Sequence, residues 1–199
     1  MSKQVEILSH ETCFDGFFRL DRYTLRHGLF EGGLSAPITR ELFERGHSIG
    51  VLPYDAGRDC VVLVEQFRIG AIDAPSGPWL MEVVAGMLDP GQKAEDVAEK
   101  ELREESGITT AELAPICEYL VSPGGASERV RLFCARIDAE GVGGIYGRDD
   151  EDEDIRVHVV PFDEAWDMLQ NGVINSAMPI IALQWLALNR ERLRDLWAE

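Results

Sequence analysis

Short apolar runs, some of them alternating with polar residues, recur over much of the chain, which is the pattern expected of β-strands. The clearest runs are 17–27 (FFRLDRYTLRH), 47–54 (HSIGVLPY), 60–70 (CVVLVEQFRIG), 79–86 (WLMEVVAG), 116–122 (ICEYLVS), 128–137 (ERVRLFCARI) and 155–162 (IRVHVVPF), with a less regular run at 38–46 (ITRELFERG). Helical patterns are confined to 94–106, 163–172 and 176–197. This order, with one internal helix and two at the end, predicts a mixed sheet with helices packed on its faces.

The first 46 residues form a strand-rich region that is interrupted by a Gly/Ser/Pro loop, GGLSAP. The region is too small to bury a core of its own. We therefore expect two parts: residues 1–46, packed on the rest of the chain or on a second subunit, and a main domain at 47–199.

The helix at 94–106 places glutamates where its buried face should be apolar. Its apolar stripe consists of Ala94, Val97, Ala98 and Leu102. Glu101 and Glu105 fall in the same arc, with Glu104 beside them, because positions three and four apart share a helix face. Like charges in a shielded place repel each other, and desolvation adds to the cost.

Three arrangements would relieve this repulsion: a shared proton, cationic side chains or a divalent metal ion. Lys100 and Arg103 lie elsewhere on the helical wheel, so we expect no local cation. Clustered carboxylate oxygens are the ligands that Mg²⁺ prefers. A structural network with distant arginines is the alternative that spacing alone leaves open.

Composition narrows the function further. The formal net charge of -17 argues against nucleic acid as a partner, although metal ions can supply local positive charge for an anionic small molecule. The four cysteines form no C-x-x-C pair and are interpreted as free thiols. The N-terminus lacks a signal-peptide core, and the apolar run MPIIALQWLAL is too short to span a bilayer, so we expect a soluble cytoplasmic protein. The P-loop and the G-x-S-x-G elbow are both absent.

The stretch 86–108, GMLDPGQKAEDVAEKELREESGI, resembles the Nudix box, G-x5-E-x7-R-E-U-x-E-E-x-G-U, where U is aliphatic. The matching residues are Gly86, Glu101, Leu102, Glu104, Glu105, Gly107 and Ile108. Gln92 replaces the first glutamate and Lys100 replaces the arginine, a pair that braces the loop against the helix in the family. We expect a weaker Gln92–Lys100 hydrogen bond in its place.

The segments RELFERGHSIGVLPYD, VVLVEQFRIG, PWLMEVVAGML, SPGGASE and DEDIRVHVV extend the resemblance to the bacterial ADP-ribose pyrophosphatase branch of this family. The resemblance implies a Nudix-type α/β/α sandwich on a mixed sheet, preceded by an N-terminal β-strand region. It also implies Mg²⁺-dependent cleavage of ADP-ribose to AMP and ribose 5-phosphate, with two or more ions and Mn²⁺ as the alternative metal. The implied assembly is a homodimer with exchanged N-terminal strands.

Two rival functions stay open. One is a pyrophosphatase for another nucleoside diphosphate sugar, such as GDP-mannose. The other is a catalytically weak nucleotide-binding regulator, which only the changes at Gln92 and Lys100 favour.

The resemblance also assigns metal ligands. Glu101 and Glu105 would bridge the ions with assistance from Glu104, and the backbone carbonyl of Ala85 would add a further ligand. These carboxylates would titrate as a coupled group.

The acidic run DDEDED at 149–154 has three interpretations. A solvated charge run is the commonest fate of such a stretch. An EF-hand is excluded, because the required Gly is Ile155 and the closing Glu is Pro161. The resemblance places the catalytic base and an extra metal ligand here, with Glu151 favoured as the base and Glu153 as the ligand, although the two could exchange roles.

The substrate contacts come from the resemblance too. Arg68 would bind the pyrophosphate or the terminal ribose, although a strand-edge arginine is an equally good interpretation. Phe17, with Arg40 and Glu41 of the other subunit, would hold the adenine by stacking and hydrogen bonding. Core packing is the alternative for Phe17.

The segment SPGGASE completes the implied substrate site. Gly124 and Gly125 would offer backbone N–H groups close to the ligand, since glycine permits close approach. Ser122 and Glu128 would flank it. A plain hairpin loop is the alternative.

Overall fold

The computed structural model describes residues 4–109, 112–148, 150 and 152–197. The chain divides into two compact units, each described here by itself. The first unit combines Met1–His47 with Leu120–Arg129, and the second combines Ser48–Tyr119 with Val130–Glu199.

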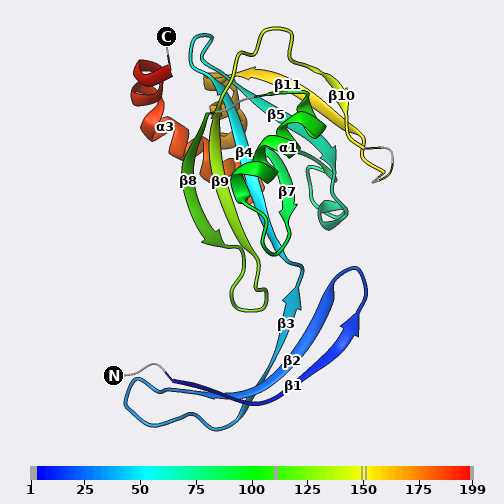
Figure 1. Ribbon diagram of the computed structural model, residues 1–199, viewed down its shortest axis with the longest axis vertical. Helices are drawn as coiled ribbons and strands as arrows, with labels where there is room; N and C mark the ends of the chain where they lie inside the picture. Colours follow the sequence, from blue (N-terminus) through cyan, green and yellow to red (C-terminus); the bar gives the residue numbers. More distant parts are fainter. Residues whose placement is uncertain (1–3, 110–111, 149, 151, 198–199) are drawn as a thin grey trace. The chain divides into compact units, whose positions relative to one another are not determined.

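The first unit is built on a three-stranded antiparallel sheet in the order β1-β2-β3, drawn in blue in Figure 1. Its strands are β1 (Val5–Asp15), β2 (Arg19–His27) and β3 (Ile38–Glu44). Alternation predicted β2 and β3 but gave no separate signal for β1. The β1–β2 register shifts twice, between Ile7 and Ser9 and between Thr12 and Phe14, and each irregularity breaks the alternation in the sequence.

No apolar side chain is buried among the described residues of this unit, and its two buried residues, Asp21 and Glu128, are both acidic. Asp21 accepts hydrogen bonds from Thr12 at 2.8 Å and Arg19 at 3.0 Å, and its Oδ2 lies 3.2 Å from His10 Nε2. Burial opposes its ionisation, but these partners outweigh burial and hold the pKa of Asp21 below its usual value. Polar cross-strand contacts therefore organise this sheet, which lacks a hydrophobic core.

The second unit contains a mixed sheet in the order β10-β11-β5-β4-β9-β8. β4 and β9 run parallel, whereas β4–β5, β5–β11 and β10–β11 are antiparallel. Its strands are β4 (His47–Asp55), β5 (Cys60–Phe67), β6 (Trp79–Glu82), β7 (Val84–Leu88), β8 (Leu113–Leu120), β9 (Arg129–Arg136), β10 (Gly144–Tyr146) and β11 (Ile155–Pro161). The sequence did not predict β10, which is too short for alternation to be visible.

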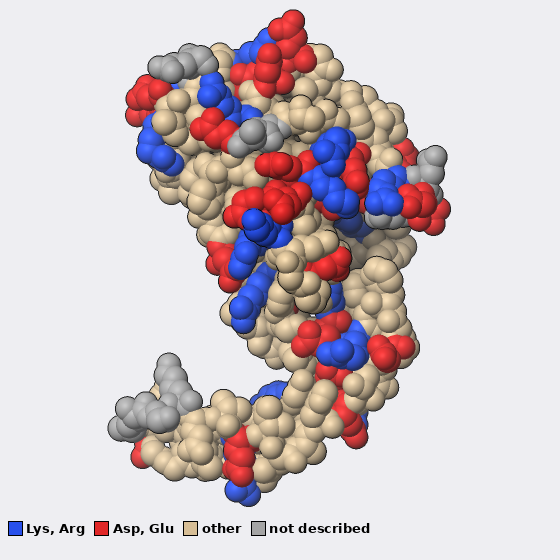
Figure 2. Space-filling view, viewed as in Figure 1, with Lys and Arg blue, Asp and Glu red and all other residues tan. Residues whose placement is uncertain are grey.

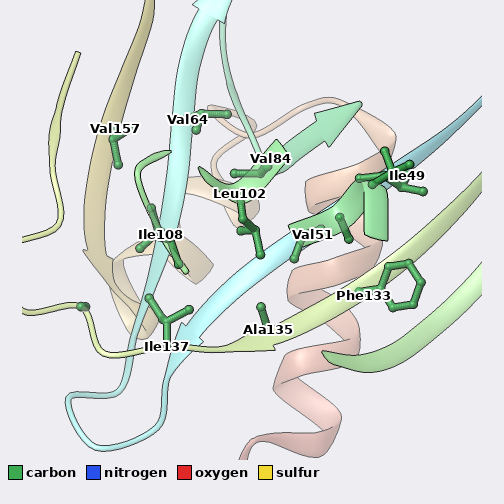
Figure 3. Close-up of a cluster of buried hydrophobic side chains, with 14 of the residues drawn as sticks. Ile49, Val51, Val64, Val84, Leu102, Ile108, Phe133, Ala135, Ile137 and Val157 are labelled. Carbon is green, nitrogen blue, oxygen red and sulfur yellow. The ribbon is translucent and has the colours of Figure 1, made fainter. Parts of the chain in front are cut away.

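Helices cover both faces of this sheet: α1 (Ala94–Ser106) on one face, and α2 (Phe162–Gln170) and α3 (Ala177–Trp197) on the other (Figure 1). Successive side chains of β4 alternate between the two faces. Ile49 and Val51 join the core under α1, and Leu52 and Tyr54 join the core under α3. Figure 3 shows Leu102 of α1 within the first of these cores. The predicted α/β/α sandwich on a mixed sheet is confirmed.

The predicted single strand at 79–86 is divided at Val83. β4 and β5 pair only beside their hairpin, through Tyr54–Val61 and Asp55–Cys60. Beyond that point β6 pairs with β5 and β7 pairs with β4, so the chain crosses from one strand to the other at Val83. This crossing brings Ala85 and Gly86 against α1.

The remaining elements are minor. A 3-10 helix, Ile69–Ala71, follows β5. α1 ends as predicted, at Gly107 in the left-handed conformation with φ 68°. Across the residues given above, no helix is long and apolar enough to cross a membrane.

Candidate active site

The centre of the site is Glu105, in the last turn of α1. Its side chain is buried, with the residue only 3% exposed, and its Oε2 accepts a hydrogen bond from the backbone N–H of Ala85 at 3.1 Å. A carboxylate that was predicted from helical spacing is thus fixed to β7, the strand that contains Gly86 and leads into the turn before α1.

The surroundings of Glu105 disfavour its charge. Burial raises its pKa to about 8, and the negative charges of Glu153 and Glu101 act in the same direction. The hydrogen bond from Ala85 and the positive charge of Arg68 oppose the shift. Glu101, Glu153 and Arg68 thus all influence the charge of Glu105.

Glu101 lies one turn earlier, directly against Gly86. A Cβ atom at position 86 would be 2.4 Å from Glu101 Cγ and 2.6 Å from its Oε1. Only glycine leaves room for this carboxylate, which explains in physical terms why the two positions occur together in the motif. Burial raises the pKa of Glu101, and Glu104 and Glu153 add to the rise against the opposing effect of Lys100.

Lys100 does not point away from the carboxylates, and the expectation from the helical wheel was wrong. Its Nζ lies 3.0 Å from Glu101 Oε1 and 3.1 Å from Glu104 Oε2. A lysine stem of four carbons lets the ammonium reach neighbours that lie off its own helical position. The pKa of Lys100 is raised, chiefly by the hydrogen bond to Glu101.

The expected Gln92–Lys100 hydrogen bond is also wrong. Gln92 Oε1 accepts a hydrogen bond from the Asp89 N–H at 3.0 Å, and the Gln92 N–H donates to the Asp89 carbonyl at 3.1 Å. Gln92 therefore closes the turn before α1, and Lys100 turns to the glutamates.

Glu104 lies between two cations. Besides the contact with Lys100, its Oε2 lies 3.7 Å from Arg148 Nη1. This oxygen is buried, and Lys100 and Arg148 meet it as ion pairs whose geometry falls short of a hydrogen bond. A buried carboxylate oxygen held only by such cations is suited to bind another cation in their place.

Part of the acidic run is brought to the same place. Glu153 Oε2 accepts a hydrogen bond from the Arg148 N–H at 3.3 Å, and its backbone packs on Gly147, where a Cβ would be 2.6 Å from the Glu153 carbonyl oxygen. Arg148 also binds Asp150 through two hydrogen bonds of 3.0 and 2.6 Å and thereby lowers the pKa of Asp150. Glu151, the favoured base, lies outside the described residues. Glu153 is half-buried, whereas Asp150, Asp152 and Asp154 are exposed, so the catalytic role of the run stays a prediction.

Arg68 is held by a residue that the sequence analysis missed. Its Nε donates to Glu82 Oε2 at 2.6 Å, and the Glu82 side chain is 16% exposed. Because Arg68 acts electrostatically on Glu105, this ion pair belongs to the same site. An acidic residue inside the apolar run WLMEVV was the available signal for Glu82.

Three predicted adenine contacts lie in the first unit. Phe17 is 93% exposed and meets Phe18 edge-on, so it is not a core residue of this chain. Arg40 Nη1 donates to the Thr39 carbonyl at 2.7 Å, and Glu41 pairs with Arg22 at 3.1 Å. That these residues form one site with the carboxylates of α1 stays a prediction.

The segment 122–128, also in the first unit, forms a tight turn. The Ser122 carbonyl accepts hydrogen bonds from the N–H groups of Gly125 at 3.1 Å and Ala126 at 2.9 Å. The Gly125 N–H is thus used within the turn in this structure, and ligand binding by Gly124 and Gly125 stays a prediction. The space beside Gly124 and Gly125 is open. Glu128 is buried, with an oxygen 3.4 Å from Arg45 Nε.

Within the described ranges, no three acidic, histidine or cysteine side chains converge as a formed metal site. The carboxylates are neutralised in part by Lys100 and Arg148, and Figure 2 shows acidic and basic side chains intermixed on this face. The residues nevertheless suit a hard divalent cation: Glu104 offers a buried oxygen that only ion pairs now hold, and Gly86 leaves room for the Glu101 carboxylate.

The chain is similar to known proteins over nearly its whole length. A family model described as NUDIX domain matches residues 44–182. An ADP-ribose pyrophosphatase of Escherichia coli (strain K12) is 48% identical over 194 residues, which cover 98% of this chain and 93% of the relative. A GDP-mannose pyrophosphatase of Shigella flexneri is 30% identical over 194 residues, with 95% and 98% covered. A solved structure described as an ADP compounds hydrolase shares the fold, with a TM-score of 0.73 at 20% identity, over 98% of this chain and 99% of the other.

Proposed function

Because the chain belongs to the Nudix hydrolase family, we propose that it is a Mg²⁺-dependent pyrophosphohydrolase that cleaves ADP-ribose to AMP and ribose 5-phosphate. The observation that carries the proposal is the buried Glu105 carboxylate, hydrogen-bonded to Ala85 and within electrostatic range of Glu101 and Glu153. Near-full-length similarity to an ADP-ribose pyrophosphatase supports the choice of substrate.

Glu101, Glu105 and the Ala85 carbonyl would hold the metal ions, with Glu104 and Glu153 as further ligands. Two or more Mg²⁺ ions are proposed, and Mn²⁺ is the alternative because it also favours oxygen ligands. Bound metal neutralises the diphosphate and lowers the pKa of coordinated water.

The acidic run supplies the base. A carboxylate of Glu151 or Glu153 accepts a proton from the attacking water, whose oxygen forms a bond to one phosphorus as the bridging oxygen–phosphorus bond breaks. AMP and ribose 5-phosphate leave as separate phosphomonoesters. Arg68, held by Glu82 at 2.6 Å, orients the diphosphate of the substrate.

The adenine would be held by residues of the first unit. Phe17 offers an exposed ring for stacking, and Arg40 and Glu41 of a second subunit offer hydrogen-bonding groups. Ser122, Gly124, Gly125 and Glu128 are proposed to flank the ligand.

A homodimer with exchanged N-terminal strands would complete this site. The first unit buries no apolar side chain among its described residues. It exposes Val5 (63%), Phe14 (63%) and Phe30 (95%). Apolar surface of this kind is typical of an interface with another chain.

Complementation tests whether two subunits share one site. Arg40→Ala and Glu105→Gln proteins are each expected to be nearly inactive. If Arg40 serves the partner's site, refolding the two together restores one intact site in each mixed dimer. A mixture that stays as inactive as its components, with mixed dimers shown by mass spectrometry, would contradict the shared site.

The activity itself is tested with a panel of nucleoside diphosphate sugars, with and without Mg²⁺. We expect ADP-ribose to have the highest kcat/KM and to yield AMP. Faster turnover of GDP-mannose would favour the rival substrate, to which the 30% identical relative points. Tight ADP-ribose binding without metal-dependent turnover of any compound would favour a regulator.

A further inference from the structure

The position of the Lys100 ammonium has a consequence for metal binding. Its Nζ lies about equally far from Glu101 Oε1, at 3.0 Å, and Glu104 Oε2, at 3.1 Å. A divalent cation held by either oxygen would lie about 2.1 Å from it, closer than the ammonium lies now. The ammonium occupies the space beside both oxygens, so such a cation would have to displace it.

We propose that Lys100 is an internal competitor for the divalent cation. In the metal-free protein its ammonium neutralises Glu101 and Glu104, and the incoming ion must displace it. This inference rests on the metal site of the proposed function, and it adds a residue that lowers the affinity of that site.

The neighbouring turn explains why Lys100 is available for this contact. Gln92 exchanges two hydrogen bonds with Asp89 and makes none with Lys100. A glutamate at position 92 facing an arginine at 100 would form a bidentate ion pair. That pair would hold the arginine side chain at the turn before α1. With glutamine and lysine that pair is absent, and the flexible stem swings to the nearest carboxylates.

Arg148, the second cationic side chain at the site, limits how much the removal of Lys100 can change metal affinity. Arg148 Nη1 lies 3.7 Å from Glu104 Oε2, but its guanidinium also binds Asp150 at 2.6 Å. Glu104 would thus keep a neighbouring positive charge after Lys100 is removed. Glu101 would lose the cation that now contacts it, so the change in metal affinity should arise mainly there.

Displacing the Lys100 ammonium should cost little free energy, because its side chain is 45% exposed. A released ammonium would return to water, so the competition should weaken metal binding without preventing it. A partly exposed ion pair of this kind corresponds to a change in binding of about fivefold.

The test compares Lys100→Met with Lys93→Met. Both changes remove one positive charge from the same segment, and Lys93 is exposed at the start of α1 without a side-chain capping bond. Mn²⁺ binding is measured by isothermal titration calorimetry without substrate, and thermal unfolding is measured in EDTA. We expect Lys100→Met to bind Mn²⁺ about fivefold more tightly than wild type but to unfold at a lower temperature in EDTA. Lys93→Met should change both much less.

The direction of the binding change separates competition from a structural role. Unchanged or weaker Mn²⁺ binding by Lys100→Met would overturn the inference, and so would equal tightening by Lys93→Met. If Lys100→Met does not fold, Lys100→Gln is judged by the same criteria. If wild type binds Mn²⁺ and Glu105→Gln does not, the proposed metal site stands whatever Lys100→Met shows. Absence of binding by every variant would overturn the metal site and this inference together.

Discussion

Glu105 Oε2 in α1 accepts a hydrogen bond from the Ala85 N–H in β7 at 3.1 Å. The bond joins the end of the helix to the strand that contains Gly86. It also places the carboxylate beside the residue whose carbonyl is a proposed metal ligand, so one contact aligns two ligands.

The raised pKa of Glu105 predicts how the metal-free protein responds to pH. Burial raises its pKa to about 8 in the folded state from an ordinary value of 4.5, so the folded protein keeps a proton that the unfolded chain releases. Stability contributed by this group is therefore present at low pH and declines as the pH rises from about 4.5 to about 8. In EDTA, Glu105→Gln should flatten the decline and raise the melting temperature at pH 8. Parallel melting curves across this range would contradict the assignment.

Gly86→Ala should damage the site more than the fold. The new Cβ would be 2.4 Å from Glu101 Cγ, and the Glu101 side chain can swing away more easily than backbone can shift. We expect activity to fall at least about tenfold, with a stability loss of about 1–3 kcal/mol. Gly57→Ala is the control, because its Cβ would meet Asp55 Oδ1 at an ordinary 3.4 Å. Full activity in Gly86→Ala would show that Glu101 need not occupy this position.

Glu82 is predicted to position Arg68. Glu82→Gln replaces the carboxylate that now holds Arg68 Nε at 2.6 Å, so Arg68 should sample more orientations. The expected result is a rise of about tenfold in KM for ADP-ribose, with a smaller change in kcat. Glu65→Gln is the control, since Glu65 in β5 pairs with His158 at 2.9 Å. Equal effects of the two substitutions would contradict the role of Glu82.

Asp21 is predicted to hold the β1–β2 pair together. Its partners lower its pKa, so its contribution is present above the ordinary carboxylate pKa and is lost as the pH falls through the lower folded value. Asp21→Asn should speed amide hydrogen exchange in β1 and β2 at neutral pH relative to wild type. The exposed Asp15→Asn is the control. Unaltered exchange in Asp21→Asn would show that the other cross-strand contacts suffice.

Patterns of neighbouring residues predicted the features that depend on contacts close in the sequence. The period of apolar residues placed α1 from Ala94, and Gly107 placed its end. Apolar runs predicted β4 and β5, whose side chains are buried almost throughout. Alternation contributed to the prediction of β9 and β11, in which buried side chains are interspersed with exposed ones. The spacing of Glu101 and Glu105 predicted that both carboxylates lie on the buried side of α1, and the two side chains are largely buried.

Contacts between distant segments lay beyond such patterns. The break at Val83 depends on β4 and β5 separating, which the run WLMEVVAG does not encode. The direction of Lys100 was wrong, because a helical wheel fixes the Cβ and leaves a four-carbon stem free to turn back. The Arg68–Glu82 pair joins β6 to the residue that follows β5, so spacing along the chain could not reveal it.

The most direct test of the central claim is the release of AMP from ADP-ribose by wild type and Glu105→Gln across a titration of Mg²⁺. The account predicts that wild-type turnover requires Mg²⁺ and that Glu105→Gln loses roughly 100-fold or more in kcat/KM. Turnover that persists in EDTA, or a wild-type rate in Glu105→Gln, would contradict it.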